Sequence, residues 1–175
     1  LRRLASEGGI LPEGIHRAKV SLSAEGNPWG EERQKRADWA EGLSVKKLTK
    51  GTEFLYFPGC VPSYDQRLKE VAVATADILK KAAVDFGILG SEENCCGESI
   101  RKAGEEELFQ RLARDNIEAF VQHGVKKILV SSPHCYYTFK NEYGELDGNF
   151  ETLHVVQLLA QLISEGKLEF TGEYK

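Results

Sequence analysis

The pattern of hydrophobic and polar positions changes at about residue 51. From Glu53 onward, short apolar runs alternate with stretches in which apolar residues recur every three or four positions, which is the spacing of one helix face. Before that point the chain is rich in Gly, Glu, Arg and Ser, and its apolar residues keep no sustained period. We therefore predict two parts: an N-terminal linker or docking arm over residues 1–51, and one folded domain over residues 52–175.

Short apolar runs predict the strands, and helical spacing predicts the segments between them. The expected strands are Phe54–Phe57, Asp85–Leu89 and Lys127–Val130, with Phe150–His154 as a fourth strand or a lead-in to a helix. The expected helices are about Ser63–Ala82, Glu98–Gly104, Glu105–His123 and Tyr136–Tyr143. A last helix is expected to end at Gly166. This alternation is typical of an α/β domain, Rossmann-like, with a mostly parallel sheet and helices on both faces.

Two features predict local order inside the arm. Gly26-Asn27-Pro28-Trp29-Gly30 is a turn sequence, and Glu31–Gly42 combines helix-forming residues with one large apolar side chain, Trp39. Two interpretations of Trp29 and Trp39 stay open: they pin the arm to the domain, or they dock a partner subunit. The chain contains no Met, so we expect it to be part of a longer protein or a processed product.

Composition and charge exclude some classes of function. The 175 residues are 41% hydrophobic and 29% charged, which is ordinary for a soluble protein. The net charge of −4 provides no global basic field, so we expect no nucleic-acid partner. No apolar run approaches the roughly 18 residues that a membrane helix needs, so we expect no direct membrane span. We predict a cytoplasmic location, with any membrane association made through partners.

The chain's four cysteines are the candidate chemical groups: Cys60, Cys95, Cys96 and Cys135. The adjacent pair is a poor disulfide, because consecutive Cα atoms lie about 3.8 Å apart and a relaxed disulfide wants roughly 4.4–6.8 Å. Each cysteine segment follows the end of a predicted strand, and in parallel sheets these ends share one edge, where ligands collect. We therefore expect the four cysteines to converge on one metal or cluster, with inert buried thiols as the alternative.

Thiolates favour zinc, copper(I) or iron in a sulfide cluster. Structural zinc sites usually take pairs of ligands from C-x-x-C knuckles, and this chain has none, so zinc is the less favoured choice. An iron-sulfur cluster accepts widely spaced ligands. Gly97, directly after the cysteine pair, would let the backbone approach closely where a Cβ would collide.

The same residues carry a family resemblance. Cys60, then Cys95-Cys96-Gly97, then Ser132-Pro133-His134-Cys135 resembles the cysteine-rich CCG domain of the B- and D-type subunits of heterodisulfide reductases and of glycolate and lactate oxidase iron-sulfur subunits. The family pattern is one Cys, a gap in the thirties, Cys-Cys-Gly, a similar gap and Cys-x-x-Cys. The resemblance covers about Phe54 to Lys167. The segment from Gly26 to Trp39, with Arg33 or Arg36, also resembles the linker that precedes a CCG domain in longer members.

The resemblance implies a [4Fe-4S]-type cluster, cubane or noncubane, held by Cys60, Cys95, Cys96 and Cys135. Ser132 stands where the family has the first Cys of Cys-x-x-Cys. In the heterodisulfide reductases, five cysteines hold a noncubane cluster that acts on a disulfide, so the missing thiolate bears on disulfide chemistry more than on cluster binding. Two hypotheses remain for Ser132: an oxygen ligand, or a hydrogen-bonding replacement near the cluster.

Other polar residues near the cysteines have predicted roles. We expect His134 either to donate a hydrogen bond to a cluster sulfur or carry a proton, or to be purely structural. Glu92 and Glu93 are interpreted as a solvated loop. Asn116 interrupts the apolar face of its helix, and we expect it to be a satisfied polar group.

These observations predict an iron-sulfur electron-transfer subunit or domain of a larger, heterodisulfide reductase-like oxidoreductase, with action on a thiol or disulfide as an extension. The implied partners are other subunits or domains of a redox complex that carry flavin, ferredoxin-type clusters or a quinone site. The alternative is a noncatalytic scaffold or zinc-binding structural subunit that has lost its redox cluster. A metal-free catalytic cysteine is disfavoured, because no cysteine has a His base at motif spacing.

Overall fold

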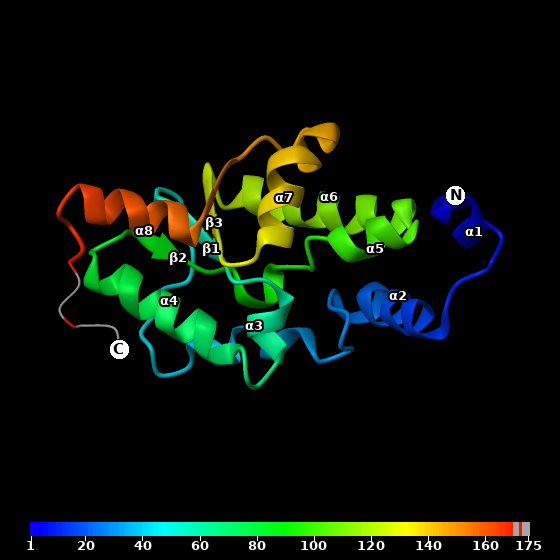
Figure 1. Ribbon diagram of the computed structural model, residues 1–175, viewed down its shortest axis with the longest axis horizontal. Coiled ribbons are helices and arrows are strands. Elements are labelled where there is room, and N and C mark those ends of the chain that lie inside the picture. Colours follow the sequence, from blue (N-terminus) through cyan, green and yellow to red (C-terminus); the bar gives the residue numbers. More distant parts are fainter. Residues whose placement is uncertain (170–171, 173–175) are drawn as a thin grey trace.

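A four-stranded, all-parallel sheet forms the centre of the computed structural model, which describes residues 1–169 and 172 (Figure 1). The strands are β1 (Phe54–Phe57), β2 (Phe86–Gly87), β3 (Lys127–Val130) and β4 (Glu151–His154), in the order β2-β1-β3-β4. All neighbouring pairs are parallel, so the predicted α/β architecture is confirmed. Strand β2 is shorter than predicted, and Ile88 instead forms an isolated bridge with Lys47 of the arm. Residues 170–171 and 173–175 of the predicted domain lie outside the described residues.

The two central strands are covered on both faces, which explains their continuous apolar sequences. Successive side chains of a strand point to opposite faces. Leu55 and Phe57 join one hydrophobic cluster, and Phe54 and Tyr56 join the other. The sheet is therefore the shared wall of two cores.

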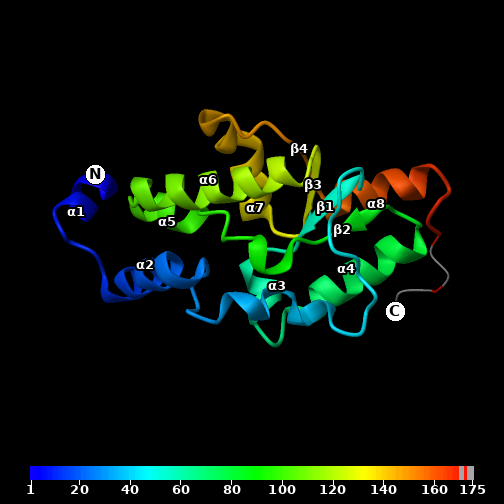
Figure 2. The same ribbon diagram turned by 180° about the vertical axis from the view of Figure 1, so that it is seen from behind.

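Helices cover each face. On one face lie α5 (Glu98–Ala103), α6 (Glu106–Gln122) and α7 (Pro133–Asn141), followed by the short 3-10 helix η3 (Tyr143–Leu146). On the other face lie α4 (Lys69–Lys81) and α8 (Val155–Ser164). Both views show α6 and α4 on opposite sides of the sheet (Figures 1 and 2). The first core is rich in aromatic edge-to-face contacts, such as Phe57 against Phe139 at 4.9 Å between ring centroids.

The N-terminal arm contains two helices that its apolar pattern does not predict, α1 (Arg2–Glu7) and α2 (Glu13–Glu25). Only Leu22 is buried in α2 and no residue is buried in α1, so neither helix needs a periodic apolar face. Both lie against α5 at one end of the molecule (Figure 1). The division of the chain at residue 51 stays a prediction.

The segment predicted as a helix around Trp39 is a 3-10 helix, η1 (Arg33–Ala40). Trp39 is 2% exposed and packs edge-to-face on Tyr56, with 5.7 Å between ring centroids. Trp29 is 44% exposed and lies near Tyr64. The interpretation that tryptophan pins the arm therefore applies to Trp39.

Two helices begin at the cysteine segments. Helix α3 (Cys60–Tyr64) starts at Cys60, before the predicted start near Ser63, and the helix predicted up to Ala82 is divided into α3 and α4. Helix α7 starts at Pro133, three residues before the predicted start, because proline is favoured at the first helical position. Cys60 and Cys135 thus lie in the first turns of helices, directly beyond the ends of β1 and β3. A 3-10 turn, η2 (Gly90–Glu92), follows β2.

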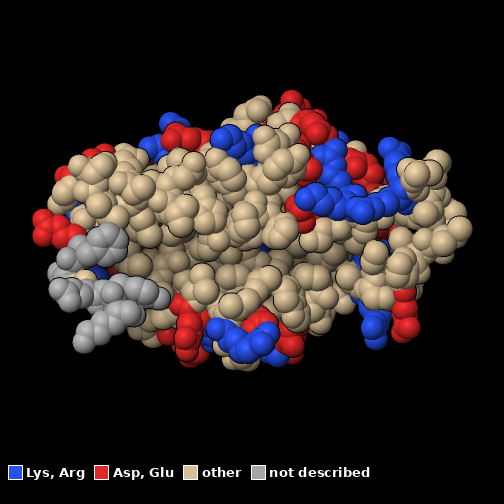
Figure 3. Space-filling model, in the orientation of Figure 1, with Lys and Arg blue, Asp and Glu red and all other residues tan. Residues whose placement is uncertain are grey.

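Uncharged side chains cover the middle of the face seen in Figure 3, and charged side chains gather mainly around its rim. Within the described part of the chain, no helix has the length and apolar character needed to cross a membrane.

Candidate metal centre

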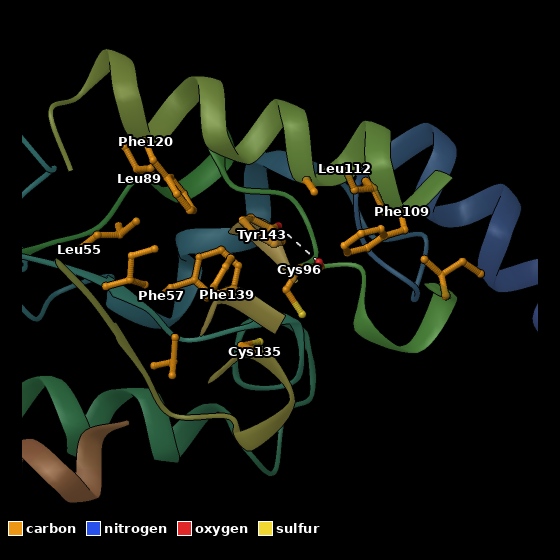
Figure 4. Close-up of a cluster of buried hydrophobic side chains, with 14 of the residues drawn as sticks. Leu55, Phe57, Leu89, Cys96, Phe109, Leu112, Phe120, Cys135, Phe139 and Tyr143 are labelled. Carbon is orange, nitrogen blue, oxygen red and sulfur yellow. Dashed lines mark hydrogen bonds between the residues drawn. The ribbon is translucent and has the colours of Figure 1, made fainter. Parts of the chain in front are cut away.

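The four cysteines lie together beyond the carboxyl ends of three strands. Cys60, Cys96 and Cys135 are buried, Cys95 is half-buried, and all four are free thiols. Cys60 follows β1, the adjacent pair follows β2, and Cys135 follows β3. Figure 4 shows the side chains of Cys96 and Cys135 pointing toward one another from different segments. The expected convergence of the four cysteines is what the geometry shows; their role as ligands stays a prediction.

The thiols contact one another in the order Cys60, Cys95, Cys96, Cys135. A hydrogen bond with Cys95, together with burial, raises the pKa of the Cys60 thiol well above its usual value. The bond with Cys60 lowers the pKa of Cys95, but contact with Cys96 and burial outweigh it and raise that pKa to about 12. Contact with Cys135 and burial likewise raise the pKa of Cys96. These three thiols are therefore neutral at pH 7 in the metal-free protein, and metal binding would release their protons.

Two glycines fit the backbone around the cysteines. Gly59 has φ +87°, and a Cβ there would lie 3.2 Å from Cys135 Sγ. Gly97 has φ +86°, and its Cβ would meet the ring of Phe109 at 2.7 Å, so the predicted collision is confirmed. The N–H of Gly97 donates to Cys95 Sγ over 3.5 Å. Both positions favour glycine because other residues rarely adopt this conformation.

Asn116 of α6 holds the backbone of the cysteine pair. Its Oδ1 accepts the N–H of Asn94 at 2.8 Å, and its Nδ2 donates to the carbonyls of Asn94 and Cys95, each at 3.3 Å. Its Nδ2 also lies 3.0 Å from the hydroxyl of Tyr143, which donates to the Cys96 carbonyl at 3.3 Å (Figure 4). Asn116 is completely buried, so the expectation of a satisfied polar group is confirmed.

Arg36 and Glu93 form a buried ion pair beside Cys60. Both side chains are 1% exposed, and Arg36 Nε lies 3.0 Å from Glu93 Oε2. Burial lowers the pKa of Arg36, but Cys60 and Glu93 outweigh it and raise that pKa. Burial raises the pKa of Glu93 against the opposing effect of Arg36. The interpretation of Glu93 as part of a solvated loop is therefore wrong, because its side chain is buried against Arg36 of the arm. The sequence around Glu93 gives no sign of this contact. Glu92 is partly exposed and contacts Lys47 and His123.

Ser132 and His134 border the cysteines in different ways. Ser132 is half-buried, and a Cβ added at Gly59 would lie 3.8 Å from the Cβ of Ser132. His134 has a side chain that is 69% exposed, and its Nδ1 lies 3.1 Å from Glu98 Oε1. In the described residues, then, His134 faces Glu98 and makes no hydrogen bond to a cysteine.

The donor set fits a sulfur-ligated metal group. Four thiols from three segments supply soft ligands, and Arg36 places a fixed positive charge beside them, which would offset the negative charge of bound thiolates. Over residues 1–169 and 172, no three His, Cys, Asp or Glu side chains are arranged to hold a single metal ion.

Comparison with protein families gives a match to the cysteine-rich domain named CCG over residues 54–140. The chain contains a CCG domain. All four cysteines lie inside the matched residues, and the predicted family is confirmed. Arg36 lies outside the matched residues.

Curated relatives extend the similarity beyond the CCG domain. The chain is 41% identical over 175 residues to the EtfAB:quinone oxidoreductase of Syntrophomonas wolfei, with 96% of this chain and 24% of the relative covered. It is 40% identical over 176 residues to the probable iron-sulfur-binding oxidoreductase FadF of Bacillus subtilis, with coverages of 95% and 25%.

A third relative is a subunit of the dihydromethanophenazine:CoB--CoM heterodisulfide reductase of Methanosarcina mazei, 33% identical over 150 residues, with 82% of this chain and 36% of the relative covered. The chain thus spans about a quarter to a third of the length of these relatives. No solved structure gives a significant match.

Proposed function

We propose that the chain is an iron-sulfur domain that carries electrons within a larger oxidoreductase. The observation that carries this proposal is the gathering of four buried or half-buried cysteines at the carboxyl edge of a parallel sheet. The names of its relatives support it, since they include an iron-sulfur-binding oxidoreductase and a heterodisulfide reductase subunit.

In this proposal Cys60, Cys95, Cys96 and Cys135 hold the cluster, which supplies one-electron redox chemistry when bound. The protein's own residues fix the ligands. Asn116 orients the backbone of the cysteine pair, and the N–H of Gly97 donates to a ligand sulfur. Burial of three of the four thiols limits access of water to the site.

Four thiolates match the ligand count of a [4Fe-4S] cluster. Ser132 occupies the position of a fifth thiolate, and a hydroxyl is a harder donor with a much higher pKa than a thiol. We therefore propose electron transfer as the main activity, with thiol or disulfide chemistry dependent on a fifth thiolate, in whose place this chain has Ser132.

The proposed partners are other domains or subunits of a redox complex. One relative is named for EtfAB and quinone, and another for a heterodisulfide. The first name supports a quinone site as one end of the electron path. Flavin-type and ferredoxin-type carriers are the further partners that the family resemblance implies.

Iron and sulfide analysis of protein purified without oxygen tests the proposal. We expect a brown protein with about four irons and four sulfides per chain. A colourless protein with one zinc per chain would contradict the proposal and favour the zinc-binding scaffold.

A Ser132→Cys variant then tests the fifth position. We expect it to retain iron and to change the electron paramagnetic resonance signal, because a fifth sulfur becomes available beside the cluster. If neither the parent chain nor the variant holds iron, the scaffold hypothesis is the better one.

A further inference from the structure

A buried arginine from the N-terminal arm reaches the cysteine group. Arg36 lies in η1, outside the CCG domain match, yet its side chain is 1% exposed. A buried guanidinium is costly unless its donors are paired. Its position therefore depends on specific contacts, and these come from the site.

The contacts hold the guanidinium in one orientation. Nε donates to Glu93 Oε2 at 3.0 Å, Nη1 to Cys60 Sγ at 3.5 Å, and Nη2 to the Asn94 carbonyl at 3.4 Å. Its Cζ also lies 5.3 Å from the ring centroid of Phe57, within the range of a cation–π contact. Arg36 thus connects a cysteine, the segment before the cysteine pair and the end of β1.

We propose that Arg36 is a positioning residue of the cysteine site: its guanidinium orients Cys60 and, opposed by Glu93, sets the reduction potential of the bound cluster. This inference rests on the proposed function. Through Arg36, the N-terminal arm contributes a charged side chain to the cysteine site.

The physical basis is the effect of fixed charge on a buried redox group. Reduction adds one negative charge to the cluster, so a nearby cation stabilises the reduced form and a nearby anion destabilises it. Arginine does not lose its proton in proteins, so its charge is constant over the working pH range. Glu93 lies 3.0 Å from Arg36, so a negative and a positive charge stand side by side next to the site and have opposite effects on its potential.

A purely structural ion pair makes a different prediction. If the pair only anchors the arm, neutralising either partner breaks the same contact, and both changes should affect the site in the same direction. If the charges act on the cluster, neutralising the cation and neutralising the anion should shift the potential in opposite directions.

The experiment is a redox titration of the iron-loaded 175-residue chain, in which electron paramagnetic resonance monitors the reduction of the cluster. We expect Arg36→Gln to lower the potential and Glu93→Gln to raise it. Each shift should correspond to about a tenfold change in the reduction equilibrium, or about 59 mV for one electron. Arg36→Lys keeps the charge and should stay close to the parent potential. Arg17→Gln is the matched control, because it removes an exposed arginine charge from α2 and should leave the potential unchanged.

The outcomes separate the two proposals. Shifts of the same sign, or shifts no larger than that of Arg17→Gln, overturn the role of Arg36 and leave the iron-sulfur function standing. A parent chain that binds no iron overturns both. If Arg36→Gln does not hold iron, the sign of the Glu93→Gln shift and a parent-like Arg36→Lys potential decide the question.

Discussion

Asn116 of α6 holds the segment Asn94–Cys95 through hydrogen bonds to its backbone. The side-chain amide of Asn116 accepts the N–H of Asn94 and donates to the carbonyls of Asn94 and Cys95. Because all of these groups are buried or partly buried, a side chain that cannot replace the bonds leaves several polar groups unsatisfied.

We expect Asn116→Leu to lower the free energy of unfolding by about 2–4 kcal/mol, since the change keeps the number and branching of the side-chain heavy atoms and removes the hydrogen bonds. Urea unfolding of the iron-free chain measures this loss, and iron content should fall in parallel. The control is Asn141→Leu, which removes an exposed amide at the end of α7 and should change stability by less than about 0.5 kcal/mol. Equal losses in the two variants would contradict the role of Asn116.

Gly97 offers a second test at the same scale, because it combines a left-handed backbone with a close neighbour. Gly97→Ala should lower the free energy of unfolding by about 2–4 kcal/mol through backbone strain and collision with Phe109. Gly166 has φ +67° and open space around its Cβ position, so Gly166→Ala carries the strain alone and should cost about 1 kcal/mol. Thermal unfolding of both variants separates the two effects; equal losses would mean that Phe109 moves aside.

The convergence of the cysteines can be predicted from the sequence, whereas the residues around them cannot. Their positions after strand ends place them on one edge of a parallel sheet, and this is a local pattern. The contact between Arg36 and Glu93 joins residues 57 positions apart, and neither residue lies in an apolar pattern. Burial of a charged pair depends on tertiary structure, so the sequence alone wrongly places Glu93 in solvent.

Among the structural elements, α1 and α2 are attached to the domain through Glu105, the residue before α6. Lys19 of α2 lies 2.6 Å from its Oε2, and Ser6 of α1 donates to its Oε1. Burial raises the pKa of Glu105, but the bonds from Lys19 and Ser6 outweigh it and lower that pKa. The folded protein therefore favours the charged carboxylate more than the unfolded chain does.

The sign of the pH effect follows from that lowered pKa. The stabilising contribution of Glu105 is fully present above its unfolded pKa of about 4.3 and is lost as pH falls through the lower folded value. Glu105→Gln should therefore lower the free energy of unfolding by about 1 kcal/mol at pH 7, and the difference from the parent should shrink toward about pH 3. Urea midpoints at the two pH values measure this.

The matched control for Glu105 is Glu107→Gln, which changes an exposed glutamate two residues later, in the first turn of α6. This variant should have the same urea midpoint as the parent chain at both pH values. If the loss of unfolding free energy in Glu105→Gln is the same at both pH values, the result would count against the ion pair with Lys19.

The elements with strong apolar periods are the ones that the sequence predicts well. Strands β1 and β3 have the predicted bounds, and α6 agrees with the prediction to within one residue at each end. Helices α1 and α2 escape prediction because they bury almost nothing, so their sequences carry no apolar stripe. The early start of α7 depends on Pro133 at its first position, a local signal that the sequence does contain.

At the scale of the whole molecule, removing the arm tests the predicted division of the chain at residue 51. The fragment 52–175 lacks Arg36 and Trp39, both almost completely buried in the full chain. We expect the fragment to hold less iron and to unfold at a lower temperature, because Tyr56 and the face toward α4 lose their cover. Iron analysis and circular dichroism of fragment and full chain provide the comparison. A fragment with full iron content and unchanged melting would support residues 52–175 as an independent domain.

The contact between Arg36 and Glu93 also constrains when the protein can mature. During synthesis the arm leaves the ribosome first, and its partner is made 57 residues later, which takes roughly 3–11 s at typical translation rates. In that interval Arg36 lacks its carboxylate partner, and Cys135 has not yet been added. Arg36 therefore cannot complete its buried ion pair until Glu93 has been made, and a site of all four cysteines cannot be complete until Cys135 has been added.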